Sequence, residues 1–298
     1  MNKSNLIKRL LVFFIGIPVV LCIVLLPYHA HIAFHVLICL MCVVGAMELY
    51  AMFSGKYKLH KKSFVVFLTI ATPLAAALYA VVPTFTGGKN IPGITGPEFI
   101  TYTFIVAILL VLVVEVFTKE SFEHSLVRIA TSSFIVLYTG FLLSFLSRMT
   151  YLTCNGVDVS SQTITIFLLM VFLCDSLAWF FGILLGKNNR GIVKASPNKS
   201  LAGFIGGLVG SVSAGILGWK LYPELFSGPV YKVLILSICT SFAAIVGDLA
   251  ESVFKRSSGV KDSGHVVPGR GGVLDTLDSI LMAGPVYYFL LLLLYHPE

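Results

Sequence analysis

Residues 100–118 read ITYTFIVAILLVLVVEVFT, and Glu115 is the one charged side chain among them. A helix needs about 20 apolar residues to cross the hydrocarbon core of a bilayer, so this stretch is long enough to span a membrane. The whole chain has the same character, because 57% of its 298 residues are apolar and only 12% are charged. Soluble domains carry about 25% charged residues. The composition therefore excludes a soluble globular enzyme and predicts an all-α polytopic membrane protein.

Comparable apolar stretches recur along the chain and predict about nine transmembrane helices. The expected spans are residues 6–27, 31–53, 63–82, 100–118, 125–147, 163–186, 201–221, 230–254 and 275–295. Lys and Arg mark the cytoplasmic ends of such spans. With the N-terminus in the cytoplasm, the basic residues left on the outside are Lys89, Arg148, Lys220 and Lys232. We therefore expect a multi-pass protein of the inner (plasma) membrane, with a cytoplasmic N-terminus and the C-terminus outside.

The two parts of the chain differ in polar content. Residues 1–160 are expected to form an N-terminal transmembrane region with about five spans and little polar character within them. Residues 161–298 are expected to form the catalytic transmembrane region, with about four spans and the cytoplasmic loops 187–200 and 255–274. Small residues four apart allow close helix packing. The seventh span has them at Gly203, Gly206, Gly207, Gly210, Gly215 and Gly218.

Acidic side chains are unfavourable at membrane depth and are usually functional there. Near the predicted inner ends of the spans, the chain has Glu48, Glu115, Asp175, Asp248, Glu251, Asp275 and Asp278. We interpret Glu48 and Glu115 as interfacial carboxylates that pair with nearby Lys and Arg. Asp248 and Asp275 instead flank the loop 255–274, which is rich in cations, glycines and hydroxyl groups.

Glycine turns and basic side chains together favour anion binding, because backbone N–H groups can approach the anion and Lys or Arg neutralises it. Carboxylates beside such a site indicate a divalent cation, and Mg²⁺ bridges protein carboxylates and phosphate oxygens. The second basic loop, residues 187–200, could hold another phosphate group. Two such sites suggest group transfer between a soluble nucleotide and a lipid. Basic loops also serve simply as topology determinants, and His265 is equally compatible with a ligand, a base or a solvated residue.

The stretch from Ser252 to Asp278 resembles the signature of the phosphatidate cytidylyltransferase (CDP-diacylglycerol synthase) family. The matching positions are Ser252, Lys255, Arg256, Lys261, Asp262, Pro268, Gly269, Gly271, Gly272, Asp275 and Asp278. The segment from Asp175 to Ser200 resembles an upstream motif of the same family, with Ser196, Pro197, Lys199 and Ser200 at its end. The chain departs from the family pattern with Arg270 in place of His, Thr276 in place of Arg, and Leu201-Ala202 in place of Trp-Glu.

The resemblance implies a nucleotidyltransferase of phospholipid biosynthesis, which converts CTP and phosphatidic acid into CDP-diacylglycerol and pyrophosphate. It implies that Asp248 and Asp275 bind Mg²⁺, that Lys255, Arg256 and Lys261 act on the phosphates in catalysis, and that a second cation is an open question. The expected substrate-binding residues are Asp175, Ser196, Lys199, Ser200, Ser252, Asp262, Arg270, Gly271, Gly272 and Asp278. The resemblance also makes a homodimer possible, and the sequence leaves the oligomeric state open.

Two other functions stay open at the level of the sequence. A CTP-dependent lipid or polyprenol kinase would release CDP, whereas cytidylyl transfer releases pyrophosphate. An ion-coupled transporter would carry its acids near the bilayer midplane on broken helices, whereas these acids lie at inner helix ends. No nucleic-acid partner is expected, because the surplus of Lys and Arg is explained by cytoplasmic loops.

Overall fold

The computed structural model of the protein describes residues 16–88, 98–267 and 271–297. In this part of the chain, eight helices are long and apolar enough to cross a membrane. They span Ile32–Ser54, Lys62–Phe85, Glu98–Val116, Phe122–Tyr151, Ser160–Leu184, Leu201–Leu221, Val230–Ser258 and Leu274–Tyr295. Eight of the predicted spans are therefore confirmed, with small shifts at their ends. Residues 6–15 of the predicted span 6–27 lie outside the described residues, and the remaining part contains helix α2 (Ile17–Leu25).

Contacts between residues divide the chain into two compact units. Unit 1 consists of residues 1–150 and 258–276, and unit 2 of residues 151–257 and 277–298. Most of the predicted anion-binding loop thus packs within the unit that the N-terminal helices form. The predicted division into regions 1–160 and 161–298 is based on the distribution of polar residues along the chain. It does not describe packing, and it stays a prediction.

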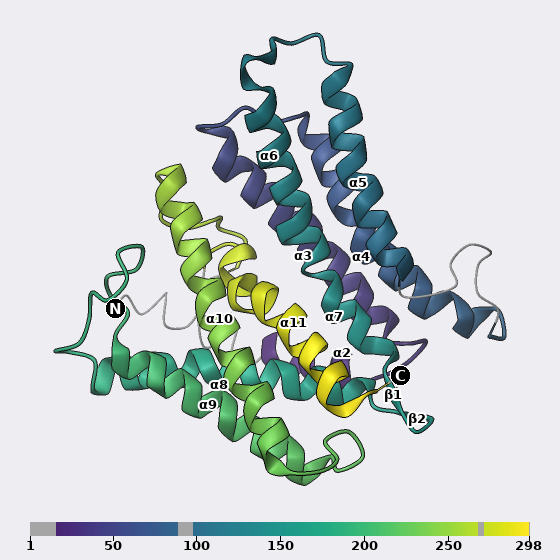
Figure 1. The fold of residues 1–298 in the computed structure, drawn as a ribbon, viewed down its shortest axis with the longest axis vertical. Coiled ribbons are helices and arrows are strands. Elements are labelled where there is room, and N and C mark those ends of the chain that lie inside the picture. The colour runs from purple at the N-terminus through teal and green to yellow at the C-terminus, as the bar shows by residue number, and fades with distance from the viewer. Residues whose placement is uncertain (1–15, 89–97, 268–270, 298) are drawn as a thin grey trace. The chain divides into compact units, whose positions relative to one another are not determined.

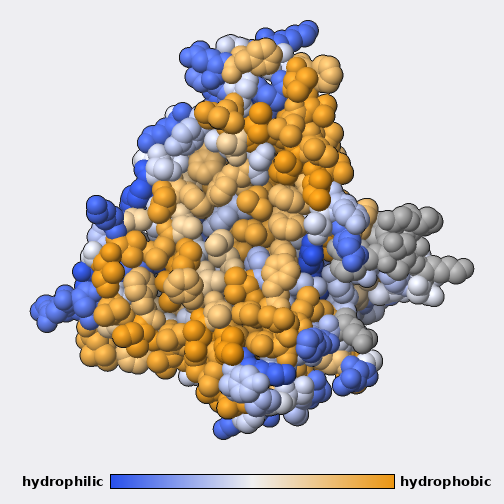
Figure 2. Space-filling view, viewed as in Figure 1, coloured by the Kyte–Doolittle hydropathy of each residue, from blue (hydrophilic) through white to orange (hydrophobic). Residues whose placement is uncertain are grey.

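Unit 1 is a bundle of apolar helices. Figure 1 shows its long helices side by side, namely α3 (Ile32–Ser54), α4 (Lys62–Phe85), α5 (Glu98–Val116) and α6 (Ser125–Ile135). Helix α4 contacts both α3 and α5, and the buried core there includes Leu68, Val111 and Val136. Apolar side chains also cover the outer surface of α5, where Figure 2 shows a continuous hydrophobic area. A surface of this kind is expected of a helix that faces lipid.

The predicted span 125–147 is not one regular helix. After α6 the chain forms a π-helical turn, η3 (Val136–Phe141), followed by the short helix α7 (Ser144–Arg148) and the 3₁₀ turn η4 (Met149–Tyr151). Gly140 of η3 lies against the backbone carbonyl of Thr69 on α4, where a Cβ atom would have no room. A π-helical turn widens the helix locally, and here it accompanies this close backbone approach.

Unit 2 is built from the long helices α8 (Ser160–Leu184), α9 (Leu201–Leu221), α10 (Val230–Ser258) and α11 (Leu274–Tyr295). The last residue of α10 and the first turn of α11 belong to unit 1. A short antiparallel hairpin, β1 (Thr153–Cys154) and β2 (Val157–Asp158), precedes α8.

The glycines of α9 allow close packing against α8, as the sequence predicts. Figure 1 shows α8 and α9 running alongside each other. A Cβ atom at Gly203 would lie 2.9 Å from the carbonyl oxygen of Ala178, and one at Gly210 would meet the carbonyl of Leu173. Since real Cβ atoms do not approach so closely, the packing of these two helices depends on glycine at these positions.

Candidate active site

The start of α11 is bound by a carboxylate from another helix of unit 1. Glu48 of α3 accepts hydrogen bonds from the N–H of Val273 through Oε1 (3.0 Å) and from the N–H of Leu274 through Oε2 (2.9 Å). The first N–H groups of a helix have no acceptor within the helix, and the positive end of the helix dipole favours an anion. Glu48 therefore caps α11, although it lies more than 200 residues earlier in the chain.

The predicted pairing of Glu48 with Lys or Arg is not found among the described residues, where its partners are backbone N–H groups. Its side chain is buried, with 7% exposure, and the ion pairs found among the described residues do not include it. The physical reason is that backbone N–H groups take the place of a basic side chain. No feature of the local sequence indicates this, because the partner groups come from a distant segment.

The predicted pairing of Glu115 with a basic residue is confirmed, and its interfacial position stays a prediction. Glu115 of α5 pairs with Arg128 of α6 and lies 2.9 Å from Nε2 of His60, and all three side chains are buried. Arg128 also donates to Glu120 and to the carbonyl of Ser121. This cluster ties the ends of α5 and α6 together by charge pairing.

Asp275 lies in the first turn of α11 and binds the loop that precedes it. Its Oδ2 accepts from the N–H of Ser263 (3.1 Å), the hydroxyl of Ser263 (2.8 Å) and the N–H of Gly272 (2.7 Å). The Ser263 hydroxyl also lies 3.3 Å from Oε2 of Glu48. Ser263 thus stands between two carboxylates that approach the loop from different helices.

The glycines of this loop make room for those carboxylates. A Cβ atom at Gly264 would meet Glu48, one at Gly272 would meet Ser263 and Glu48, and one at Gly271 would lie 2.5 Å from Oδ2 of Asp275. Gly271 also has a φ of +116°, which disfavours other residues. Its N–H donates to the carbonyl of Val267. Binding of a phosphate by Gly271 and Gly272 stays a prediction, while in this structure both N–H groups have protein acceptors.

Other predicted residues of unit 1 are solvent-accessible. Lys261, Asp262 and His265 are exposed in the loop. Arg270, together with Pro268 and Gly269 of the signature, lies outside the described residues. The loop therefore offers charged side chains on a backbone that Glu48 and Asp275 fix.

Unit 2 contains a group of four carboxylates. Asp278 of α11 lies close enough to interact electrostatically with Asp175 of α8 and with Asp248 and Glu251 of α10. The Ser279 hydroxyl donates to Asp175 (3.2 Å). Gly247 permits this approach of α10 to α11, because a Cβ there would meet the backbone carbonyl of Asp278.

Two lysines pair with these carboxylates. Lys199, from the loop before α9, lies 2.5 Å from Oδ2 of Asp248, and both side chains are partly exposed. Lys255 pairs with Glu251, which is fully buried. Helical spacing places Glu251 on one face with Asp248 and Lys255, but the sequence pattern assigns it no role. Its spacing of four residues from Lys255 is the sequence feature that indicates this ion pair. Arg256 is exposed, and Ser252 is half-buried.

The end of the loop 187–200 is compact. Ser200 is buried, and its Oγ accepts from the N–H of Gly203 at 3.1 Å, so it caps α9. Arg190 and Ser200 form an isolated β-bridge across the loop. Ser196 is half-buried and accepts a backbone hydrogen bond from Lys199. Nucleotide contacts of Ser196, Lys199 and Ser200 stay predictions.

The predicted metal ligands belong to different units and are each bonded to protein groups. Asp248 pairs with Lys199 in unit 2, and Asp275 binds Ser263 and Gly272 in unit 1. In the part of the chain that the structure describes, no three His, Cys, Asp or Glu side chains are placed to hold a metal ion together.

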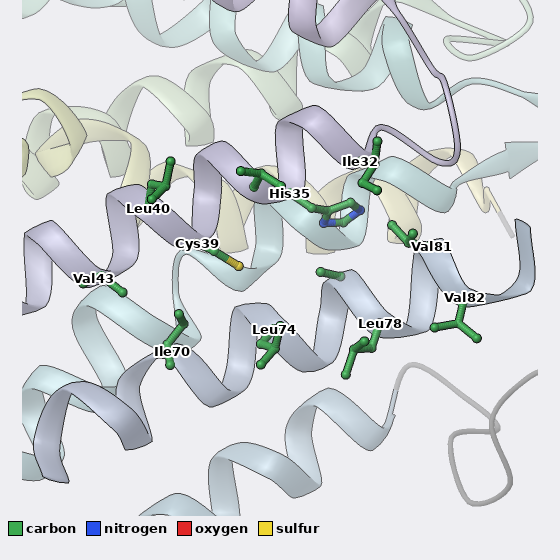
Figure 3. Close-up of a pocket in the computed structure, with 12 residues that line it drawn as sticks. Ile32, His35, Cys39, Leu40, Val43, Ile70, Leu74, Leu78, Val81 and Val82 are labelled. Carbon is green, nitrogen blue, oxygen red and sulfur yellow. The ribbon is translucent and has the colours of Figure 1, made fainter. Parts of the chain in front are cut away.

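An apolar cavity of about 330 Å³ lies between α3 and α4, apart from these polar groups (Figure 3). Its lining includes Cys39, Leu74 and Leu78, and the ring of His35 points into the space between the two helices. His35 also lies 3.1 Å from the hydroxyl of Thr150 through Nε2. None of the predicted site residues lines this cavity.

The chain is similar to known cytidylyltransferases. The model of the cytidylyltransferase family matches residues 7–294. A phosphatidate cytidylyltransferase of Staphylococcus haemolyticus (strain JCSC1435) is 43% identical over 124 residues, which are 42% of this chain and 46% of that protein. The phosphatidate cytidylyltransferase of Staphylococcus aureus (strain COL) is 42% identical over 124 residues, with the same shares. The chain therefore matches about half the length of these relatives.

Proposed function

The chain belongs to the cytidylyltransferase family, and from this premise we propose that it is a phosphatidate cytidylyltransferase. The proposed reaction joins CTP and phosphatidate to give CDP-diacylglycerol and pyrophosphate. The observation that carries the proposal is a basic loop at the start of a membrane-spanning helix, with its backbone bound by Glu48 and Asp275 and with Lys261 exposed on it. The matched relatives, which bear this enzyme's name, support the proposal.

The reaction is a displacement at phosphorus. An oxygen of the phosphatidate phosphate attacks the α-phosphorus of CTP, a new P–O bond forms, and the bond to the bridging oxygen breaks as pyrophosphate leaves. The attacking phosphate is already anionic, so no strong general base is required. The main barrier is the approach of two anions in line, which positioning and fixed cations lower.

Basic side chains of the chain supply the fixed cations. Lys255, Arg256 and Lys261 are assigned to the phosphate groups, and Arg270 adds a permanent positive charge. The nucleotide is assigned to Ser196, Lys199 and Ser200. Further substrate contacts are assigned from the sequence signature, namely Asp175, Ser252, Asp262, Gly271, Gly272 and Asp278.

Mg²⁺ is the proposed cofactor, and its ligands are Asp248 and Asp275. Carboxylate oxygens are the donors that Mg²⁺ prefers. The Asp248 side chain is partly exposed and thus accessible to a metal ion, which would share or displace the ammonium group of Lys199. When bound, the metal would neutralise charge on the phosphate oxygens.

The proposal places the active site on the cytoplasmic side of a multi-pass membrane protein. Eight candidate spans support the membrane setting, and the basic residues of the loops 187–200 and 255–274 support the orientation. The phosphatidate acyl chains would stay in the bilayer while the phosphate reaches the loop.

The products of one incubation test the proposal. Purified protein is incubated with cytidine-labelled CTP, phosphatidate and Mg²⁺, and the lipid and aqueous products are separated by chromatography. We expect labelled CDP-diacylglycerol and pyrophosphate, with neither product when phosphatidate is omitted. Release of CDP with an unlabelled phosphorylated lipid would show phosphoryl transfer, and the protein would then be a lipid kinase.

A further inference from the structure

We propose that Glu48 is a positioning residue for the reaction, which fixes residues 263–264 and 271–274 and the orientation of Asp275 without contacting the substrate. This inference rests on the proposed function. It concerns a residue of α3, a helix in which the sequence signature has no part. All the contacts that support it lie within unit 1.

The first support is the two-point contact of the carboxylate with the backbone. Oε1 and Oε2 of Glu48 accept from the N–H groups of two consecutive residues, Val273 and Leu274. A single carboxylate that binds both groups fixes the direction in which α11 starts. Hydrogen bonds of this kind, from backbone N–H to an ionised acceptor, are about twice as strong as neutral ones.

The second support is the link to Asp275. The Ser263 hydroxyl lies 2.8 Å from Oδ2 of Asp275 and 3.3 Å from Oε2 of Glu48. A hydroxyl group has one proton to donate, so its orientation responds to both carboxylates. Loss of the charge at Glu48 therefore changes the hydrogen bonding of Asp275 through Ser263.

The third support is the fit of the loop around the side chain. A Cβ atom at Gly264 would meet Glu48, and one at Gly272 would meet both Ser263 and Glu48. Both glycines thus lie directly against this carboxylate, and the Glu48 side chain is buried, with 7% exposure. A residue in contact with the loop in this way sets the shape of the loop.

The test compares Glu48→Gln with a matched carboxylate of the same unit, Glu115→Gln, in the full-length protein in lipid nanodiscs. Glu115 is similarly buried but pairs with Arg128 instead of the loop. For Glu48→Gln we expect kcat to fall by about 10- to 100-fold, as for partners that orient metal ligands, with little change in the KM for CTP. We expect faster hydrogen–deuterium exchange in the peptide 263–276. Glu115→Gln should lower the thermal midpoint and leave exchange in that peptide unchanged.

A double-variant cycle tests the link through Ser263. We expect Ser263→Ala to lower kcat, and the double variant Glu48→Gln/Ser263→Ala to lose less than the product of the two single effects. Multiplicative effects would overturn the link. Unchanged exchange of residues 263–276 in Glu48→Gln, or unchanged kcat, would overturn the positioning role itself.

The experiment also distinguishes failure of this inference from failure of the proposed function, and it covers a variant that does not fold. If the wild type makes no CDP-diacylglycerol, the function is wrong, and hydrogen exchange alone then decides whether Glu48 anchors the loop. If Glu48→Gln does not fold, Ser263→Ala keeps the question open to measurement, because it removes a half-buried hydroxyl and leaves the Glu48 cap in place. A Ser263→Ala variant with normal kcat and normal exchange would then overturn the part of the inference by which Glu48 orients Asp275 through Ser263.

Discussion

Glu48 and Glu115 are buried carboxylates of the same unit with different partners. Glu115 has Arg128 thirteen residues further along the chain, and the sequence predicts pairing with a basic residue because both lie near the ends of neighbouring spans. Glu48 has backbone N–H groups as partners. A backbone group carries no residue identity, so no reading of single residues could have revealed this contact. The site residues that resemble a family signature were predictable, whereas the residue that binds their loop was not.

Asp248 and Asp275 are expected to be essential for different structural reasons. Asp248→Asn and Asp275→Asn should each lower turnover by at least about 100-fold, since even residues that only orient metal ligands are worth about 10- to 100-fold. Asp248→Asn should leave the thermal midpoint nearly unchanged, because its pair with Lys199 is partly exposed and such pairs stabilise little. Asp275→Asn should also accelerate hydrogen exchange at Ser263 and Gly272, whose N–H groups it accepts.

A Mg²⁺ titration of both variants supplies the check. A variant that reaches normal turnover at high Mg²⁺ has lost metal affinity only, as expected of a ligand. Normal turnover of a variant at every Mg²⁺ concentration would show that the replaced carboxylate is not a metal ligand.

Arg270 replaces a histidine of the family pattern, and its charge is permanent. We expect Arg270→His to retain more activity at low pH and to lose it as pH rises, because histidine has an unperturbed pKa of about 6.5 and is charged only below it. The wild type should not show that loss. A pH profile of kcat/KM for both proteins is the measurement, and parallel profiles would show that charge at this position is not required.

At the scale of elements, helix α9 depends on glycine where it meets α8. Gly210→Ala should destabilise the protein by about 1–3 kcal/mol, the usual effect of overpacking, because the added Cβ meets the carbonyl of Leu173. Gly45→Ala on α3 is the matched control, since its Cβ would lie 3.7 Å from the nearest atom and alanine favours the helix. Thermal unfolding of the two variants measures the difference. Equal midpoints would mean that α8 and α9 adjust freely.

The spans themselves were predictable because their length and apolar character follow directly from the thickness of the bilayer. The interruption of the predicted span 125–147 by η3 was not. The turn accompanies the close approach of Gly140 to the backbone of Thr69, and glycine is also frequent in regular transmembrane helices. The length and apolar character of a stretch therefore indicate where a helix crosses the membrane, while contacts with its neighbours decide whether it is regular.

At the scale of the whole molecule, orientation in the membrane is the open prediction. Cysteine placed at the exposed positions Asn188 and Val260 should react with an impermeant maleimide only after cells are permeabilised, because the loops 187–200 and 255–274 are expected in the cytoplasm. Cysteine at the exposed position Ser227, between α9 and α10, should react in intact cells. The wild type, which has six cysteines of its own, sets the background. Labelling of the Asn188 and Val260 variants in intact cells would show that the orientation is the reverse of the predicted one.

The cap that Glu48 provides also has a consequence for the order of events during synthesis. A ribosome adds about 5–20 residues per second, so Glu48 leaves it roughly 10–45 s before Val273, which lies 225 residues later. During that interval the carboxylate has none of the loop N–H groups that it binds in the finished protein. The cap at the start of α11 can therefore form only after residues 273 and 274 have been made.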